Sequence, residues 1–253
     1  MRILAIGDVV GDRAVSYLEE HLWDVRRANR VDFAVANGEN AAEIRGLNAA
    51  QAARLFAAGV DAITLGNHTY GQKDLYPVLE ADARLVRPAN FPPQAPGMGY
   101  AVLPSDGGRV LVMNVCGRVF METYADPFAA VETILRREAG NYDVSLLDVH
   151  AEATSEKLAI AHTFDGKIDV VFGTHTHVPT ADEQILPRGT AYQSDVGMTG
   201  PVDGILGVST AAVLEKFRSL MPVRFSTAAG PVRANATLFV TGSASVAPQR
   251  LVF

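Results

Sequence analysis

The sequence Gly-Thr-His-Thr-His at 173–177 constrains this chain more than any other feature does. It follows the apolar run 168–172, which is typical of a buried strand. The two imidazoles of the motif, His175 and His177, stand at positions i and i+2 and can both turn toward one metal ion. A His-x-His pair is frequent by chance, but it seldom comes directly after an apolar strand that ends in glycine. The motif therefore predicts a metal site at the end of this strand.

Four earlier segments repeat the same layout, in which an apolar run ends on residues whose side chains bind metal ions. The residues at these ends are Asp8, Glu39 with Asn40, Asn67 with His68, and His150. In open α/β sheets the ligand crevice lies outside the carboxyl ends of the strands. We therefore expect the five clusters to meet in space, although Asp8 and His177 are far apart in the sequence.

The residue types at these strand ends suit a centre with more than one ion. Glu39 can bridge two cations with its two oxygens, and Asn40 adds a neutral oxygen ligand. Because adjacent side chains point in different directions, Asn67 can bind metal while His68 faces the substrate. We treat this division of labour as a hypothesis.

Each of these residues also has a plainer interpretation when it is taken alone. Asp8 lies in a glycine-flanked turn, where a turn aspartate or a helix N-cap is common. His150 can be a hydrogen-bonded core histidine. Asn37-Gly38 is a frequent hairpin turn, although no second strand follows to complete a hairpin. Only the combination of the clusters favours a metal site.

Length and composition limit the classes of protein to which the chain can belong. At 253 residues it can bury one sizeable core, and we expect a single domain over 1–253. The formal net charge of −6 argues against an extended basic surface for nucleic acid or an anionic membrane, while a local cationic site can still bind a small phosphate. Cys116, the one cysteine, excludes an intramolecular disulfide and favours a reducing compartment. We expect a cytoplasmic protein without a signal peptide or membrane span, and we leave a homo-oligomer open.

Strand-like and helix-like patterns alternate through the first two-thirds of the chain, which is typical of a parallel sheet. Strands are expected at 2–7, 32–36, 143–148 and 168–172, and helices at 14–27, after Asn48, and from Asp126 to Gly140. Asn48 is a good N-cap, and Asp126 is a good N-cap followed by proline at the first helical position.

The remaining segments favour antiparallel strands. Prolines mark a loop after residue 84, and apolar runs on both sides of Ser-Asp-Gly-Gly at 105–108 predict a β-hairpin. Hairpin-like runs also fill 183–194 and 235–252, with one helix near 209–218 between them. Parallel strands first and antiparallel strands later predict two sheets packed face to face with helices outside.

Other catalytic chemistries find little support. The chain has no Gly-x-Ser-x-Gly elbow, no phosphate-binding loop, and no dinucleotide fingerprint. Cys116 is interpreted as a small buried strand residue rather than a nucleophile. His21 and His162 fall in helical patterns and are given no role. Asp195 and Thr199 lie in a glycine-rich loop, and we do not assign them to the site.

The series of motifs resembles the calcineurin-like metallophosphoesterases, and within them the YmdB-like branch, over nearly the whole chain. Four departures from the common superfamily pattern are visible: Val10 in place of a histidine, Glu39 in place of an aspartate, Thr69 in place of an acid, and Thr174 between Gly173 and the histidine pair. The missing histidine removes a ligand from one ion. Asn40, which the YmdB-like branch uses at this place, is the substitute.

The resemblance implies a four-layer α/β/β/α sandwich of two mixed sheets, and a phosphodiesterase that acts on 2′,3′-cyclic nucleotides. It implies two metal ions, the first bound by Asp8, Glu39, Asn40 and His177, and the second by Glu39, Asn67, His150 and His175. Manganese or iron suits this mixed oxygen and nitrogen set. His68 resembles the histidine that donates a proton beside the phosphate, so it is expected to be the general acid.

Two other functions compete with this interpretation. A binuclear amidohydrolase uses similar ligands on a (β/α)₈ barrel, but eight regular βα units are absent and the last third favours strands. A cyclic-nucleotide sensor or RNA-turnover regulator can keep the same metal site with slow hydrolysis. The sequence does not separate this regulator from an efficient enzyme.

Overall fold

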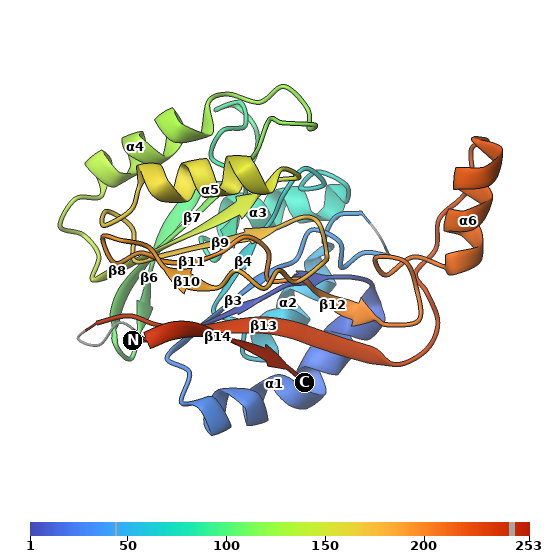
Figure 1. Cartoon of the computed structure of the whole chain (residues 1–253), viewed down its shortest axis with the longest axis horizontal. Helices are drawn as coiled ribbons and strands as arrows, with labels where there is room; N and C mark the ends of the chain where they lie inside the picture. Colours follow the sequence, from blue (N-terminus) through green and yellow to red (C-terminus); the bar gives the residue numbers. More distant parts are fainter. Residues whose placement is uncertain (44, 243–245) are drawn as a thin grey trace.

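The chain folds around two β-sheets with helices on both outer sides, as Figure 1 shows for the computed structural model. The structure describes residues 1–43, 45–242 and 246–253. Its α-helices are α1 (Asp12–Asn29), α2 (Ala49–Ala57), α3 (Tyr76–Ala81), α4 (Pro127–Arg137), α5 (Thr154–Thr163) and α6 (Thr210–Ser219). In Figure 1, α4 and α5 lie on the opposite side of the sheets from α1, and α6 stands away from the rest.

The first sheet has eight strands and is built from both ends of the chain. Its order is β2 (Asp8–Val9), β12 (Met198–Pro201), β13 (Val232–Val240), β1 (Arg2–Ile6), β3 (Phe33–Asn37), β4 (Ala62–Thr64) and β5 (Leu85–Val86), and β14 (Val246–Val252) pairs with β13. Strands β1, β3, β4 and β5 are parallel, whereas β13 runs antiparallel to β1.

The second sheet has six strands from the middle of the chain. Its order is β10 (Gln184–Ile185), β11 (Ala191–Gln193), β9 (Val170–Thr174), β8 (Val144–His150), β7 (Gly108–Cys116) and β6 (Tyr100–Ser105). The four central strands are parallel, and the edge strands β6 and β10 are antiparallel to their neighbours.

Three apolar layers hold the two sheets and their helices together. In β1, Leu4 and Ile6 face α1 and α2, while Ile3 and Ala5 face the second sheet. Both faces of the strand are buried, as expected for a strand with period-two alternation between two cores. A third layer joins the second sheet to α4 and α5. The predicted α/β/β/α sandwich of two mixed sheets is confirmed.

Most of the predicted elements are present within a few residues of the expected bounds. Asn48 accepts a hydrogen bond from the backbone N–H of Gln51 at 2.8 Å, and Asp126 accepts one from Phe128 at 2.9 Å. Both residues therefore cap helices as predicted. The predicted hairpins pair as β6 with β7, β10 with β11, and β13 with β14.

The structure differs from the sequence prediction in how the chain is shared between the sheets. The antiparallel strands near the C-terminus do not form a separate sheet, because β12, β13 and β14 return to the first one. Strand β13 lies beside β1, the first strand of the chain. Within the part of the chain that the structure describes, no helix is long and apolar enough to cross a membrane.

Parallel pairing brings the strand ends to one edge of each sheet. In the second sheet, Cys116 lies opposite His150, and His150 lies opposite Thr174. In the first sheet, Val10 and Asn40 form a bridge just past β2 and β3. Asn37 Nδ2 lies 3.1 Å from Asp148 Oδ2, so the polar ends of the two sheets meet.

Candidate metal centre

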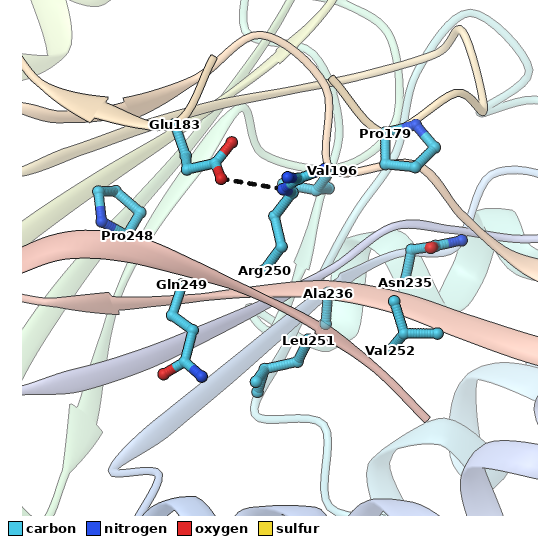
Figure 2. Close-up of a pocket in the computed structure, with 10 residues that line it drawn as sticks. All are labelled: Pro179, Glu183, Val196, Asn235, Ala236, Pro248, Gln249, Arg250, Leu251 and Val252. Carbon is cyan, nitrogen blue, oxygen red and sulfur yellow. Dashed lines mark hydrogen bonds and ion pairs between the residues drawn. The ribbon is translucent and has the colours of Figure 1, made fainter. Parts of the chain in front are cut away.

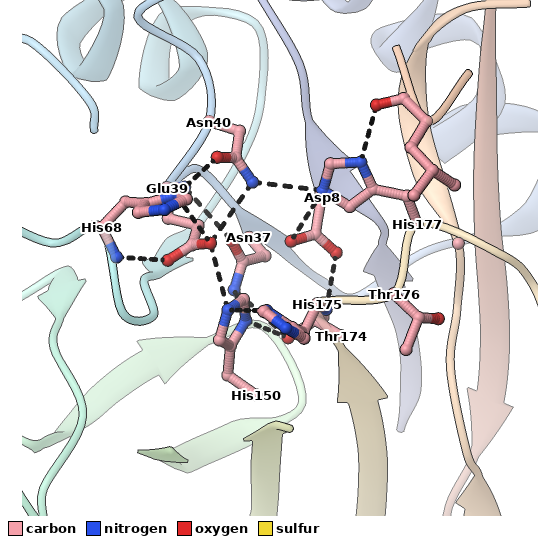
Figure 3. A network of polar contacts seen from close by, with 12 residues as sticks. Asp8, Asn37, Glu39, Asn40, His68, His150, Thr174, His175, Thr176 and His177 are labelled. Carbon is pink, nitrogen blue, oxygen red and sulfur yellow. Dashed lines mark hydrogen bonds and ion pairs between the residues drawn. The ribbon is translucent and has the colours of Figure 1, made fainter. Parts of the chain in front are cut away.

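All eight predicted site residues lie around one centre at the strand ends. Figure 3 shows that Asp8, Glu39 and Asn40 from the first sheet point toward His150, His175 and His177 from the second. Asn67 and His68 follow β4 and join the same group through His150 and Glu39. The structure therefore brings together every residue of the predicted site, while the assignment of each to an ion stays a prediction.

In one half of the centre, three polar atoms surround Nε2 of His150. It lies 3.0 Å from Glu39 Oε1, 3.0 Å from Asn67 Oδ1 and 3.1 Å from His175 Nδ1. A single N–H cannot donate to three acceptors at once. A cation bound by all four groups satisfies them together, and this donor set suits a borderline divalent metal.

Each of the three imidazoles has its outer nitrogen next to an acceptor. The outer partners are the Leu206 carbonyl for His177 at 3.1 Å, Thr174 Oγ1 for His150 at 2.8 Å, and Glu152 Oε2 for His175 at 3.2 Å. A proton held at the outer nitrogen leaves the lone pair of the other nitrogen facing the centre. This arrangement is typical of histidines that bind metal, because an outer acceptor fixes the tautomer and the ring orientation.

The other half of the centre contains Asp8, Asn40 and His177. His177 Nε2 lies 3.2 Å from the Asn40 amide nitrogen and 3.8 Å from Asp8 Oδ1. Asp8 Oδ1 is buried and has no hydrogen-bond partner among the described residues. A buried carboxylate oxygen without a partner is costly, so its place beside an imidazole nitrogen fits a bound cation.

Asn40 is oriented differently from a metal ligand. Its Oδ1 lies 3.0 Å from Nδ1 of His68, and its nitrogen faces Glu39 and His177. Binding an ion through oxygen requires a half-turn of the amide, which exchanges the two atoms. After that half-turn the amide nitrogen faces His68 Nδ1, which can accept from it, so Asn40 can contact the centre and His68 at the same time.

Glu39 links the two halves. Its Oε1 lies 3.0 Å from His150 Nε2 and 3.3 Å from the Asn40 nitrogen, and its Oε2 accepts the backbone N–H of His68 at 2.9 Å. The side chain is only 1% exposed. Glu39 therefore contacts both groups of predicted ligands, through the same oxygen, Oε1.

The charges of these buried groups depend on one another. Burial opposes the ionisation of Glu39, but His150 and His68 outweigh it and lower the pKa of Glu39 to about 2. Burial also favours neutral His150, yet Glu39 raises the pKa of His150 to about 9. Burial and the nearby His150 lower the pKa of His175 to about 3. His175 is therefore neutral at pH 7, which is the form in which an imidazole binds a metal ion.

Two further carboxylates, which the sequence analysis did not assign, support the ligands. Asp148 is buried beneath His150, where it accepts hydrogen bonds from Thr174 Oγ1 at 2.7 Å and Thr64 Oγ1 at 2.6 Å. Thr174 in turn contacts His150 Nδ1. The threonine that separates Gly173 from the histidine pair therefore orients the His150 ring. The strand-end pattern includes Asp148, two residues before His150, but does not identify its partners.

Asp195 and Lys157 form a buried ion pair at 2.8 Å under the histidine loop. Lys157 also donates to the carbonyl of Thr174, and Asp195 accepts from the N–H and hydroxyl of Thr176. These bonds hold the loop on both sides of His175, whose φ of 97° is unusual for a residue other than glycine. Asp195 is therefore a buried support of the loop rather than a residue exposed to substrate.

The turn after β4 explains two residues of the Gly-Asn-His-Thr motif. A Cβ atom at Gly66 would lie 2.3 Å from both Glu39 Oε2 and the His150 ring, so only glycine fits. The hydroxyl of Thr69 donates to the Gly66 carbonyl at 2.6 Å and closes the turn. Thr69, which replaces the acid of the common superfamily pattern, thus has a structural role here.

His68 lies at the edge of the centre and is partly exposed. Its Nδ1 lies 3.0 Å from Asn40 Oδ1 and 3.5 Å from Glu39 Oε1. Burial is the main cause that lowers the pKa of His68. Its side chain lines a cavity of about 400 Å³ together with Glu39, Asn40, His175 and His177. This volume lies within the range of small-molecule sites, about 300–1,000 Å³.

A separate cavity of about 390 Å³ lies beside β14. Figure 2 shows its lining residues, among which Glu183 and Arg250 form an ion pair at 3.0 Å. None of the predicted ligands lines it. Cys116 is also buried, at the end of β7, and burial raises the pKa of its thiol well above the usual value. Neither feature competes with the metal centre.

Comparison with known proteins identifies the family. The model of the YmdB-like protein family matches residues 4–249. A 2′,3′-cyclic-nucleotide 2′-phosphodiesterase of Bacillus subtilis is 44% identical over 230 residues, which cover 91% of this chain and 87% of that protein.

Two crystal structures have the same fold. A protein of Thermus thermophilus, described as hypothetical, superposes with a TM-score of 0.94 at 44% identity, covering 100% of this chain and 99% of that one. A phosphatase from Mycoplasma pneumoniae superposes with a TM-score of 0.90 at 29% identity, covering 100% and 93%. The chain belongs to the YmdB-like family and has the four-layer fold of the metallophosphoesterases.

Proposed function

We propose that this protein is a metal-dependent phosphodiesterase that hydrolyses 2′,3′-cyclic nucleotides. The family and the activity named for the Bacillus subtilis relative make the chain a hydrolase of phosphodiester bonds. The structural observation that supports the proposal is a set of three imidazoles, each with its outer nitrogen beside an acceptor. The inner nitrogens of His150 and His177 lie beside the buried carboxylates of Glu39 and Asp8.

The side chains divide into two sets of four that share Glu39. Glu39, Asn67, His150 and His175 would hold one ion, and Asp8, Glu39, Asn40 and His177 the other. The sets contain oxygen and nitrogen ligands without thiolate, which suits manganese or iron. Two such ions supply a hydroxide nucleophile at neutral pH and positive charge beside the phosphate oxygens.

Charge at the centre favours an anion despite the acidity of the whole chain. Two divalent ions bring +4 against −2 from the carboxylates of Asp8 and Glu39, while the formal net charge of the protein is −6. Because the carboxylates are buried among imidazoles and amides, this local excess of positive charge is little screened. A phosphodiester, which carries one negative charge, fits such a site.

His68 is the proposed general acid. It lines the cavity, and its Nδ1 is held by Asn40, so Nε2 is the nitrogen that remains for the substrate. Opening a 2′,3′-cyclic phosphate releases a ribose alkoxide, which needs a proton. A positioned acid contributes about 100- to 10,000-fold to such a step.

A substrate panel tests the proposal. Purified protein supplied with Mn²⁺ is compared on 2′,3′-cyclic nucleotides, 3′,5′-cyclic nucleotides and nucleoside monophosphates, with and without a chelator. We expect the 2′,3′-cyclic compounds to be hydrolysed fastest and only with metal. Faster hydrolysis of either other class contradicts the proposed specificity. Tight nucleotide binding with very slow turnover supports the alternative of a regulatory protein that keeps the metal site.

A further inference from the structure

The lining of the cavity beside the metal centre has two chemically different parts. The polar part of the lining contains Glu39, Asn40, the imidazoles and Arg45. The apolar part of the lining, here called the apolar end, consists of Leu206, Val208 and Phe225, of which Leu206 is exposed and the other two are partly exposed. One cavity therefore joins a site for an anion to a site for an apolar, flat group.

The apolar end is built into the fold rather than formed by loose side chains. A Cβ atom at Gly207 would lie 2.7 Å from Val10 Cγ1, so the turn at 205–208 packs directly on Val10. Val10 stands where the common superfamily pattern has a histidine ligand, and here it forms the floor under this turn.

Backbone hydrogen bonds fix the turn to the segment that carries Phe225. Ala228 N–H donates to the Gly207 carbonyl at 2.8 Å, and Ser209 N–H donates to the Ser226 carbonyl at 3.0 Å. The Leu206 carbonyl lies 3.1 Å from Nδ1 of His177. The apolar end and the metal ligand are thus held at a fixed separation.

We infer that the apolar end is the nucleoside subsite: the base packs against Leu206, Val208 and Phe225 while the phosphate lies among the metal ligands and Arg45. The inference rests on the proposed function and adds which residues select a nucleotide. Aromatic side chains bind every base through its π-face, so this subsite tolerates different bases. Arg45 contacts the phosphate, because a guanidinium matches its geometry.

The opposite flank of the centre is a less suitable subsite. A cavity there is lined by Asn67, Tyr70, Phe91 and Tyr124, but the rings of Phe91 and Tyr124 stack on each other at 4.8 Å. Their facing surfaces are therefore already occupied. Phe120, which is 89% exposed, is a further aromatic residue on that side and lines a cavity with Asn67 and His175.

Binding measurements on Mn²⁺-loaded protein test the subsite without any turnover. The probes are a nucleoside 3′-monophosphate and inorganic phosphate, and the variants are Phe225→Ala and Arg45→Met. We expect Phe225→Ala to weaken nucleotide binding about 10-fold and to leave the Kd for phosphate unchanged. Arg45→Met is expected to weaken both probes by the same factor, since its contact is with the phosphate.

Phe120→Ala is the matched control, because it removes an aromatic ring from the other flank, and it is expected to change neither Kd. A selective loss of nucleotide binding in Phe120→Ala, or an unchanged nucleotide Kd in Phe225→Ala, overturns the inference. If Phe225→Ala does not fold, the wild-type protein is tested instead. The nucleoside monophosphate should bind to it about 10-fold tighter than ribose 5-phosphate. Equal binding of the two compounds contradicts the subsite.

The outcome is separable from that of the proposed function. Absence of 2′,3′-cyclic nucleotide hydrolysis by the wild type would contradict the proposed activity. The binding measurements would still show whether the apolar end binds a nucleoside. Hydrolysis together with equal binding of nucleotide and ribose phosphate would keep the activity and remove the subsite.

Discussion

Glu39 makes the site depend on a single side chain. It is buried, it contacts both groups of proposed ligands, and it supplies one of their two carboxylates. Replacing it with glutamine keeps the shape and removes the charge, so Glu39→Gln is expected to lose more bound metal than any other single ligand change. Elemental analysis of the purified variant measures this. Glu122→Gln, an exposed acid outside the ligand set, is the control, and two ions per chain retained in Glu39→Gln would show that the bridge is misplaced.

A variant at Asn40 tests whether its amide replaces the histidine ligand that this chain lacks. Its amide faces Glu39 and His177 on one side and His68 on the other. Asn40→Ala is expected to weaken one ion selectively, because the set of Asn67, His150 and His175 does not include it. Titration with Mn²⁺, followed by calorimetry, should show one weakened site. Loss of both ions, or of neither, argues against this ligand.

His68 is next to a proposed ligand in the sequence, but its proposed role is to donate a proton rather than to bind metal. His68→Ala is expected to keep both ions and to lose turnover on 2′,3′-cyclic nucleotides by about 100-fold or more. Aryl esters such as bis-p-nitrophenyl phosphate should lose at least about 10-fold less, since nitrophenolate leaves without a proton. Equal loss of turnover on both substrates would show that His68 stabilises the negative charge of the phosphate instead of donating a proton. Loss of bound metal would show that His68 is a metal ligand.

At the scale of elements, the loop that carries His175 and His177 is supported by helix α5, which contributes none of the proposed ligands. Lys157 of α5 and Asp195 are both fully buried and bond to the loop from either side. Breaking a buried ion pair leaves one charge without a partner, which destabilises a protein by about 3–5 kcal/mol.

Lys157→Met is therefore expected to lower the free energy of unfolding by about this amount of 3–5 kcal/mol, measured by urea denaturation. Adding Asp195→Asn should recover part of the loss, because it removes the uncompensated charge. Lys167→Met, an exposed lysine just beyond the same helix, should cost less than about 1 kcal/mol. Equal losses in the two lysine variants would show that the buried pair does not stabilise the fold.

The sequence indicated which residues meet at the strand ends because each one is a local signal. A strand that ends on a metal-binding residue is contained in a few neighbouring positions, as with His175 and His177 after β9. Lys157 and Asp195 were missed for the opposite reason, since they are 38 residues apart and meet only after α5 packs under the loop. The helix pattern around Lys157 gives no sign that its charge is buried.

At the scale of the whole molecule, the sequence predicted the layers but not that the C-terminal strands join the first sheet. Hairpin signals show that β13 and β14 pair, yet they contain no information on which sheet receives them. Strand β13 joins β1 through a register from Arg2 opposite Val240 to Ile6 opposite Ala236, so both ends of the chain build the sheet that carries Asp8 and Glu39. Residues from both sheets contribute to the centre.

A metal titration tests the central claim most directly. The purified protein is stripped with a chelator, Mn²⁺ is added back in steps, and bound ions per chain and the rate of 2′,3′-cyclic nucleotide hydrolysis are measured on the same samples. The shared Glu39 and the two ligand sets predict two ions per chain, with hydrolysis absent in stripped protein and appearing as the second ion binds. Saturation at one ion, or full hydrolysis by the stripped protein, would contradict the account.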